Sequence, residues 1–158
     1  MSNLPCTKLS ENTKFGMSRT KILVVDDFLP WQQFVLETFE SESDSSILYF
    51  AGDGLEAVQK AHELEPDVIL MDISLPVMNG FEAARKIRGF LPRAKVLFVS
   101  ERRSRDYIQG AFDAGASGYI LKSDANTDLF RGVVAVQTGQ QFLSHSLKDW
   151  RKSSDSGE

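Results

Sequence analysis

The chain has 158 residues, of which 42% are hydrophobic and 25% are charged, so its composition excludes a fibrous or wholly disordered protein. Its 18 Lys and Arg against 22 Asp and Glu give a net charge of −4, which disfavours direct binding to the phosphate backbone of DNA. The one cysteine, Cys6, cannot form an internal disulfide, and the apolar runs are too short for a membrane span. We expect a cytoplasmic protein with one folded core and no membrane segment.

Both ends of the chain are polar and lack a repeating apolar face. Residues 1–20 are predicted to be a disordered leader, because Ser, Asn, Thr and Lys dominate there. Residues 142–158 are predicted to be a C-terminal tail or a truncated linker, with His145 as a surface residue. The folded domain is then expected to occupy residues 21–141.

Short apolar runs alternate with segments of helical periodicity along this domain. The runs mostly lack alternation of apolar and polar residues, as expected for strands that are covered on both faces. Five strands are predicted, at Ile22–Val25, Ile47–Phe50, Val68–Met71, Val96–Val99 and Tyr119–Leu121.

Each strand is followed by apolar residues spaced three and four positions apart, which predicts five helices. The first of these stripes consists of Trp31, Phe34, Val35, Thr38 and Phe39. The second helix is predicted to have Asp53 as its N-cap and to end before Pro66. This (βα)₅ order predicts an α/β fold, a doubly wound parallel five-stranded sheet between two layers of helices. Sites in such sheets lie beyond the carboxyl ends of the strands.

Polar residues stand at those carboxyl ends. Asp26 and Asp27 follow the first strand, Asp72 the third, Ser100 the fourth and Lys122 the fifth. Each alone is explained as a helix cap, a turn residue or a solvated charge. Together, three carboxylates on one rim repel one another unless a cation lies between them, and Mg²⁺, or Mn²⁺ in its place, fits that need. A lysine and a hydroxyl opposite the metal suit a phosphoryl group, so the rim is predicted to hold an aspartyl phosphate.

The segments KILVVDD, VILMDISLPVMNG, VLFVS and GYILK stand along the chain in this order. They resemble the signature segments of the response-regulator receiver domain, the CheY-like family, over roughly Lys21 to Gln140. The resemblance implies a flavodoxin-like fold with strand order 2-1-3-4-5. It also implies a phosphoprotein of two-component (phosphorelay) signal transduction, which takes a phosphoryl group from a histidine kinase or a phosphotransfer protein. Such a receiver is a switch rather than an enzyme, since it catalyses only its own phosphorylation and dephosphorylation.

The resemblance also implies a role for each residue of the rim. Asp72 would be the phosphoacceptor. Asp27 would bind Mg²⁺ directly, together with Asp72 and the backbone carbonyl of Ser74, whereas Asp26 would hold the ion mainly through water. Lys122 would pair with the acceptor carboxylate before transfer and with a phosphoryl oxygen afterwards.

Two further residues are implied to couple phosphorylation to shape. Ser100 would move to hydrogen-bond a phosphoryl oxygen, and Tyr119 would turn inward behind it. Phosphorylation would then bias the face that the fourth helix, the fifth strand and the fifth helix form.

The sequence departs from the family pattern after two of these residues. Glu101 follows Ser100, where the family usually has a small residue, so phosphorylation is expected to be slow or restricted to particular partners. Arg102 and Ser74 stand at positions that tune dephosphorylation in the family. Ser123 replaces the proline that many receivers have after the lysine, and its peptide bond is expected to be trans.

The sequence from Lys122 and Ser123 to the later GQQFLS is similar to the NarL/FixJ-type (LuxR-class) receivers, which usually precede a helix-turn-helix domain for transcription regulation. No such effector domain is expected here, so the chain is either a single-domain regulator or a receiver cut from a longer protein. DNA would be contacted only indirectly, through an effector domain, and a homodimer could form.

Two alternative functions remain open. One is a phosphorylation-independent (pseudo-receiver) interaction module, which the unusual Glu101 motivates. The other is a Mg²⁺-dependent phosphatase with an aspartate nucleophile, which is disfavoured because such enzymes need a D-x-D motif and Phe28 stands two residues after Asp26.

Overall fold

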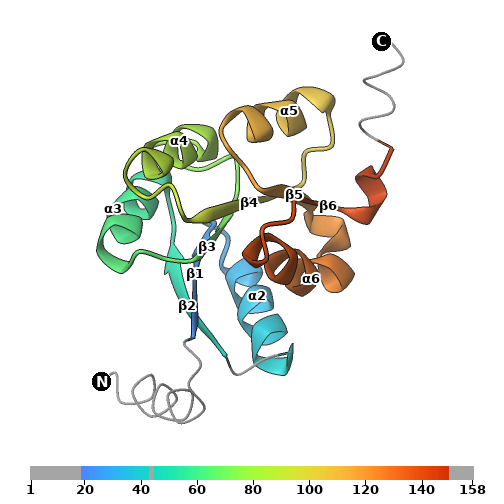
Figure 1. Ribbon diagram of the computed structural model, residues 1–158, viewed down its shortest axis with the longest axis horizontal. Helices are drawn as coiled ribbons and strands as arrows, with labels where there is room; N and C mark the ends of the chain where they lie inside the picture. The colour runs from blue at the N-terminus through green and yellow to red at the C-terminus, as the bar shows by residue number, and fades with distance from the viewer. Residues whose placement is uncertain (1–18, 43–44, 150–158) are drawn as a thin grey trace.

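The computed structural model describes residues 19–42 and 45–149, and Figure 1 shows its ribbon. Its middle layer is a parallel sheet with the strand order β2-β1-β3-β4-β5-β6. The strands are β1 Thr20–Val25, β2 Ser46–Ala51, β3 Val68–Met71, β4 Lys95–Ser100, β5 Gly118–Leu121 and β6 Phe142–Leu143. The predicted order 2-1-3-4-5 is therefore confirmed, and a sixth strand extends it.

Helices cover both faces of this sheet (Figure 1). The helices are α2 Leu29–Glu42, α3 Gly54–Leu64, α4 Gly80–Phe90, α5 Arg105–Asp113 and α6 Ala125–Gln137, with short 3₁₀ turns η1 Lys122–Asp124 and η2 His145–Leu147. Helices α2 and α6 pack on one face, and α3, α4 and α5 pack on the other. The α/β three-layer architecture is confirmed.

The two core layers explain why the strands read as continuous apolar runs. In β1, Ile22 and Val24 face the layer under α2 and α6, while Leu23 and Val25 face the layer under α3, α4 and α5. All four side chains are at most 1% exposed. A strand with two buried faces gains nothing from polar residues at alternate positions.

Local signals set the limits of α3 as predicted. The side chain of Asp53 accepts a hydrogen bond of 2.7 Å from the backbone N–H of Glu56, which satisfies a free donor of the first turn. The helix ends at Leu64, and Glu65 takes a left-handed conformation with a φ of 50° before Pro66.

The N-terminal boundary of the domain differs from the prediction. Residues 1–18 of the expected leader lie outside the described residues, but Thr20 already belongs to β1. Arg19 is buried, and its guanidinium donates a hydrogen bond of 2.9 Å to the carbonyl of Ser46. The expected boundary at residue 20 is therefore too late, because the edge of β2 orders the chain earlier.

Residues Phe142–Leu147, here called the docked segment, were predicted to be part of a tail, and that prediction is wrong. Phe142 and Leu143 pair with Gly118 and Tyr119 of β5 as the sixth parallel strand. Glycine makes this pairing feasible, because a Cβ at position 118 would lie 2.5 Å from the carbonyl oxygen of Phe142. A strand of two residues is too short to show a periodicity in the sequence.

Two buried carboxylates hold the rest of the docked segment. Asp124 accepts hydrogen bonds from the hydroxyl of Ser144 and from the N–H and hydroxyl of Ser146, the latter two at 3.1 and 2.8 Å. Asp128 accepts one of 2.9 Å from the N–H of His145, whose ring Nδ1 also lies 2.9 Å from the carboxylate. His145 is therefore more than the expected surface residue, although its side chain is 52% exposed.

These contacts also set the protonation of both carboxylates. Burial alone would raise the pKa of Asp124, but the hydrogen bonds from Ser144 and Ser146 outweigh it, and the pKa lies below its usual value. The pKa of Asp128 is lowered in the same way, since the hydrogen bonds from His145 outweigh its burial. Both side chains are therefore charged acceptors at neutral pH, which strengthens their hold on the segment.

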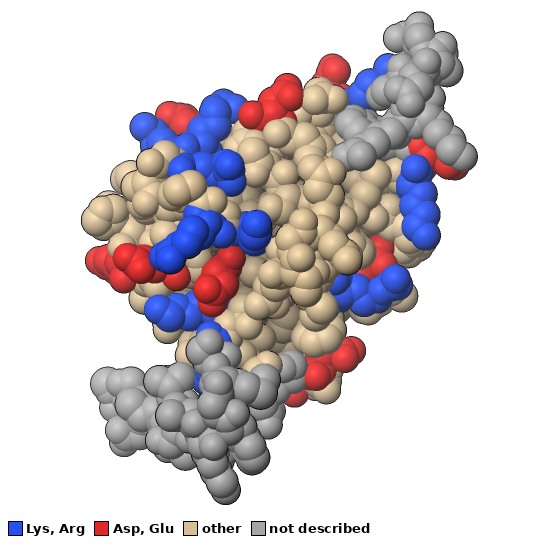
Figure 2. All heavy atoms as spheres, viewed as in Figure 1, with Lys and Arg blue, Asp and Glu red and all other residues tan. Residues whose placement is uncertain are grey.

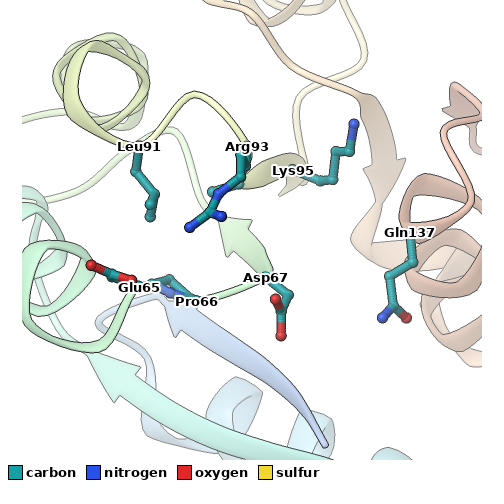
Figure 3. A pocket seen from close by; sticks show the side chains of 8 residues that line it. Glu65, Pro66, Asp67, Leu91, Arg93, Lys95 and Gln137 are labelled. Atoms are coloured by element: carbon teal, nitrogen blue, oxygen red, sulfur yellow. The ribbon is translucent and has the colours of Figure 1, made fainter. Parts of the chain in front are cut away.

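A cavity of about 310 Å³ lies among the loops that lead into β3 and β4, at the opposite end of the sheet from the acidic residues (Figure 3). Its lining mixes Glu65 and Asp67 with Arg93 and Lys95. In Figure 3, Arg93 points toward Pro66, whereas Lys95 points away. The cavity includes none of the residues predicted for the site. No helix in the described ranges is long and apolar enough to cross a membrane.

Candidate functional site

The candidate site lies at the carboxyl ends of four neighbouring strands. Asp26 and Asp27 follow β1, Asp72 follows β3, Ser100 ends β4, and Lys122 follows β5. Because parallel strands end at the same edge of a sheet, the order β1-β3-β4-β5 places these side chains around one point. Carboxylate oxygens of the three aspartates lie within 4.8 Å of one another.

Asp26 is the most deeply buried carboxylate of the site, with 1% of its side chain exposed. Its Oδ1 accepts a hydrogen bond of 2.9 Å from the backbone N–H of Phe28, and its Oδ2 lies 2.6 Å from the Nζ of Lys122. Its backbone carbonyl accepts a hydrogen bond of 2.8 Å from the side chain of Gln32. Asp26 thus joins the end of β1 to the first turn of α2 and to the lysine.

Lys122 is paired differently from what the family resemblance implied. Its ammonium lies 3.9 Å from Oδ2 of Asp72, against 2.6 Å from Asp26. The closer pair forms where the need for a counter-charge is greater, because the side chain of Asp26 is 1% exposed and that of Asp72 is 14% exposed. On another side, the ammonium lies 5.0 Å from the centroid of the Trp31 ring.

Asp72 is held in an environment that disfavours its negative charge. Burial raises the pKa of its carboxyl to about 6, the neighbouring Asp26 and Asp27 add to the rise, and Lys122 opposes it. Its Oδ1 accepts a hydrogen bond of 2.8 Å from the N–H of Ile73. A cation near these oxygens would favour the ionised form, which is the nucleophilic one.

The loop from Asp72 to α4 folds tightly against the site. The N–H of Gly80 donates a hydrogen bond of 2.8 Å to the carbonyl of Ile73, and a Cβ at Gly80 would lie 2.1 Å from the carbonyl oxygen of Asp72. Ser74 is exposed in this loop. Val77 is 75% exposed and has a φ of 69°, a left-handed conformation that costs a β-branched residue ~1–3 kcal/mol. The sequence carried no signal for this strain.

Ser100 and Tyr119 are both buried, and the backbone of Arg102 holds both of them. The hydroxyl oxygen of Ser100 accepts a hydrogen bond of 3.0 Å from the N–H of Arg102, and the hydroxyl of Tyr119 donates one of 2.7 Å to its carbonyl. Burial raises the pKa of Tyr119 to about 12, which keeps its hydroxyl a donor. The guanidinium of Arg102 lies 5.1 Å from the ring centroid of Tyr107.

Beside Lys122 lies a hollow of about 480 Å³, here called the aromatic hollow. It is lined by Phe28, Pro30, Trp31, Phe34, Glu101, Lys122, Ser123 and Asn126. Glu101 is exposed at this position. The peptide bond before Ser123 is trans as expected, since the described part of the chain contains no cis bond. Sequence reasoning placed Trp31 only in the apolar stripe of a helix; its place four residues after Asp27, at the site end of α2, was the available signal.

The chain matches the family model described as the response regulator receiver domain over residues 22–133. It is 33% identical over 137 residues to the transcriptional regulatory protein LnrK of Bacillus subtilis, a match that covers 84% of this chain and 62% of LnrK. It is 35% identical over 123 residues to the response regulator protein VraR of Staphylococcus aureus, which covers 78% of this chain and 59% of VraR. The chain thus spans about three-fifths of the length of these relatives.

Solved structures give the same result. A LuxR-family two-component response regulator from Aurantimonas superposes with a TM-score of 0.74 at 31% identity, over 78% of this chain and 89% of that one. The family resemblance and the fold that it implied are therefore confirmed.

Proposed function

Because the chain belongs to the response-regulator receiver family of two-component systems, we propose that it accepts a phosphoryl group on Asp72 from a histidine kinase or a phosphotransfer protein, with Mg²⁺ at the acidic rim. The observation that carries this proposal is the convergence of three carboxylates within 4.8 Å, with Lys122 beside them. Carboxylates in that number, next to a lone ammonium, suit a divalent cation and a phosphoryl group.

The donor set fits Mg²⁺ or Mn²⁺. Both oxygens of Asp26 already have partners in Phe28 and Lys122, so this residue would act on the ion through water. Asp27 is exposed, and Asp72 is half-buried beside it, so their oxygens would bind the ion directly together with the carbonyl of Ser74. The ion would neutralise the negative charge that gathers around the transferred group.

The remaining chemistry belongs to side chains of this chain. The carboxylate of Asp72 attacks the phosphorus, a P–O bond forms, and the P–N bond to the histidine of the donor breaks. Lys122 shifts from Asp26 and Asp72 to a phosphoryl oxygen. The cycle ends when water hydrolyses the acyl phosphate, so the chain catalyses only its own phosphorylation and dephosphorylation.

The change would spread through the backbone of Arg102. When Ser100 turns its hydroxyl to a phosphoryl oxygen, the N–H of Arg102 loses its acceptor, and the loop that also holds Tyr119 is free to move. The face formed by α5, β5 and α6 would change with it. This coupling biases two pre-existing states of the face rather than creating a new one.

The output of this switch would be an effector domain or a partner protein in the cytoplasm. Both relatives described above are regulators longer than this chain, and LnrK is named a transcriptional regulatory protein. Figure 2 shows acidic and basic side chains interspersed on one face, with no broad basic patch. Contact with DNA would accordingly be indirect, and the two-state face could also pair with a second copy.

One alternative has an observation of its own. Glu101 stands beside the hydroxyl that would bind the phosphoryl group, is exposed, and lines the aromatic hollow. A carboxylate there would repel an incoming phosphoryl group, which favours a module that a partner switches without phosphorylation. Arg102, which with Ser74 and Glu101 would tune the reaction, lies over Tyr107 rather than within reach of an ion pair with Asp72.

Intact mass spectrometry tests the proposal. The chain is incubated with Mg²⁺ and phosphoramidate, beside an Asp72→Asn variant and a sample with excess EDTA. One added phosphoryl group, absent from both controls, is the expected result. Addition to Asp72→Asn would exclude Asp72 as the acceptor, and no addition even with a broad-specificity histidine kinase would favour the phosphorylation-independent module.

A further inference from the structure

We propose that Trp31 is a positioning residue for Lys122, and that its ring keeps the ammonium group beside Asp26 and Asp72. This inference rests on the proposed function, because the position of Lys122 matters to the reaction only if Asp72 accepts a phosphoryl group. It assigns to an aromatic residue of α2 a part in phosphoryl transfer through the lysine.

The ammonium of Lys122 has three neighbours of different kinds. It lies 2.6 Å from a carboxylate oxygen of Asp26, 3.9 Å from one of Asp72, and 5.0 Å from the centroid of the Trp31 ring. The face of an indole ring attracts a cation within about 6 Å of its centroid. The lysine side chain is 15% exposed, so this attraction acts with little screening by water.

The Trp31 ring is itself held in place. It belongs to the first turn of α2, where the N–H of Trp31 donates a hydrogen bond of 3.1 Å to the carbonyl of Phe28. The ring of Phe34 packs against it with 5.2 Å between the centroids. Asp26 ties the same turn to the site through its contacts with Phe28 and Gln32. The ring and the buried carboxylate therefore form one rigid frame around the lysine.

The aromatic hollow shows what the ring prevents. A lysine side chain has four rotatable bonds, and a space of about 480 Å³ opens beside this one. Glu101 lines the same space and offers a second carboxylate to the ammonium. Without the indole face, Lys122 would spend part of its time away from Asp72, and its charge would not be in place when the phosphoryl group arrives.

Phosphorylation rates test the role through a double-mutant cycle. Mass spectrometry follows phosphoramidate labelling of the parent chain, Trp31→Leu, Trp31→Phe, Lys122→Met and the double variant Trp31→Leu/Lys122→Met. Phe130→Leu is the matched control, because Phe130 is an aromatic residue of the same core layer and does not line the hollow. Thermal unfolding verifies that each variant is folded.

We expect Trp31→Leu to slow labelling about three- to tenfold, Trp31→Phe to retain most of the rate, and Phe130→Leu to match the parent within about twofold. In the Lys122→Met background, Trp31→Leu should have no further effect, because the ring acts through the lysine. An equal loss from Trp31→Leu with and without Lys122 would overturn the proposal, as would an unchanged rate in Trp31→Leu.

Nuclear magnetic resonance separates this inference from the function on which it rests. A lysine under an indole face gives an upfield-shifted ε-methylene signal, which Lys122→Met assigns by its disappearance. We expect this signal in the parent and its return to the ordinary position in Trp31→Leu. A parent with the shifted signal but no labelling would refute the proposed function and leave the placement of Lys122 intact. A labelled parent without the shifted signal would refute the role of Trp31.

Discussion

The hydroxyl of Ser144 donates a hydrogen bond to the carboxylate of Asp124, a buried residue that follows Lys122 by two positions. The same hydroxyl oxygen accepts a hydrogen bond of 3.2 Å from the N–H of Leu121, the residue before the lysine. One serine of the docked segment therefore contacts the chain on both sides of the residue that would bind the phosphoryl group.

This arrangement predicts that Ser144→Ala destabilises the protein. The substitution leaves a buried carboxylate and a buried N–H without their partner, which costs ~1–3 kcal/mol. Ser123→Ala is the control, because Ser123 is exposed in the same loop. Urea unfolding followed by circular dichroism measures both variants. Equal stability of Ser144→Ala and the parent would show that the docked segment contributes nothing to the fold.

A pair of glycine substitutions tests the packing of β6. Gly118→Ala would place a Cβ 2.5 Å from the backbone oxygen of Phe142, so β6 must separate from β5 and the melting temperature should fall. Gly89→Ala is the control in α4, where a Cβ meets nothing within 4 Å, and it should raise stability by ~1 kcal/mol. Opposite signs are expected in thermal unfolding, and a neutral Gly118→Ala would contradict the pairing.

The charge of Asp72 predicts a pH-dependent stability in the absence of metal. Burial raises the pKa of this carboxyl from 3.8 to about 6, so the folded state favours the neutral form. Its contribution to stability is complete below pH ~4 and is lost as the pH rises through ~6. Asp72→Asn should therefore be more stable than the parent at pH 8 by ~1–3 kcal/mol, and the two should converge near pH 4.

Chemical unfolding in EDTA across this pH range measures the difference. Millimolar Mg²⁺ should reduce it at pH 8, because a bound cation stabilises the charged parent and not the amide. A parent that is more stable than Asp72→Asn at pH 8 in EDTA would contradict the environment described for this carboxyl.

The left-handed conformation of Val77 predicts that glycine is favourable there. Val77→Gly removes the clash of a β-branched side chain at a φ of 69° and should raise the free energy of unfolding by ~1 kcal/mol. Val134→Gly is the matched control, because Val134 is exposed within α6 and glycine lowers helix stability there. A loss of stability in Val77→Gly would show that the valine side chain contributes more than its conformation costs.

Much of the fold could be predicted from the sequence, because each buried strand is an apolar run and each rim residue directly follows such a run. The convergence of Asp26, Asp72 and Lys122 follows from the topology of the sheet alone. The closer pairing of Lys122 with Asp26 could not be predicted, since it depends on how deeply each carboxylate is buried.

The docked segment and Trp31 escaped prediction for different reasons. The segment has a strand of two residues, and its anchors Asp124 and Asp128 stand among ordinary helix residues in the sequence. Trp31 fits the apolar stripe of α2, and periodicity does not tell that the end of the stripe faces an ammonium rather than the core.

The sixth strand has a consequence for contacts between molecules. A sheet that ended at β5 would present the unpaired backbone groups of four apolar residues, Gly118–Leu121, to any other extended chain. With β6 in place, that border offers only the two residues Phe142 and Leu143, a short edge that is a poor template for intermolecular strand pairing. The two aspartates that anchor the docked segment therefore also protect the protein against aggregation through this edge.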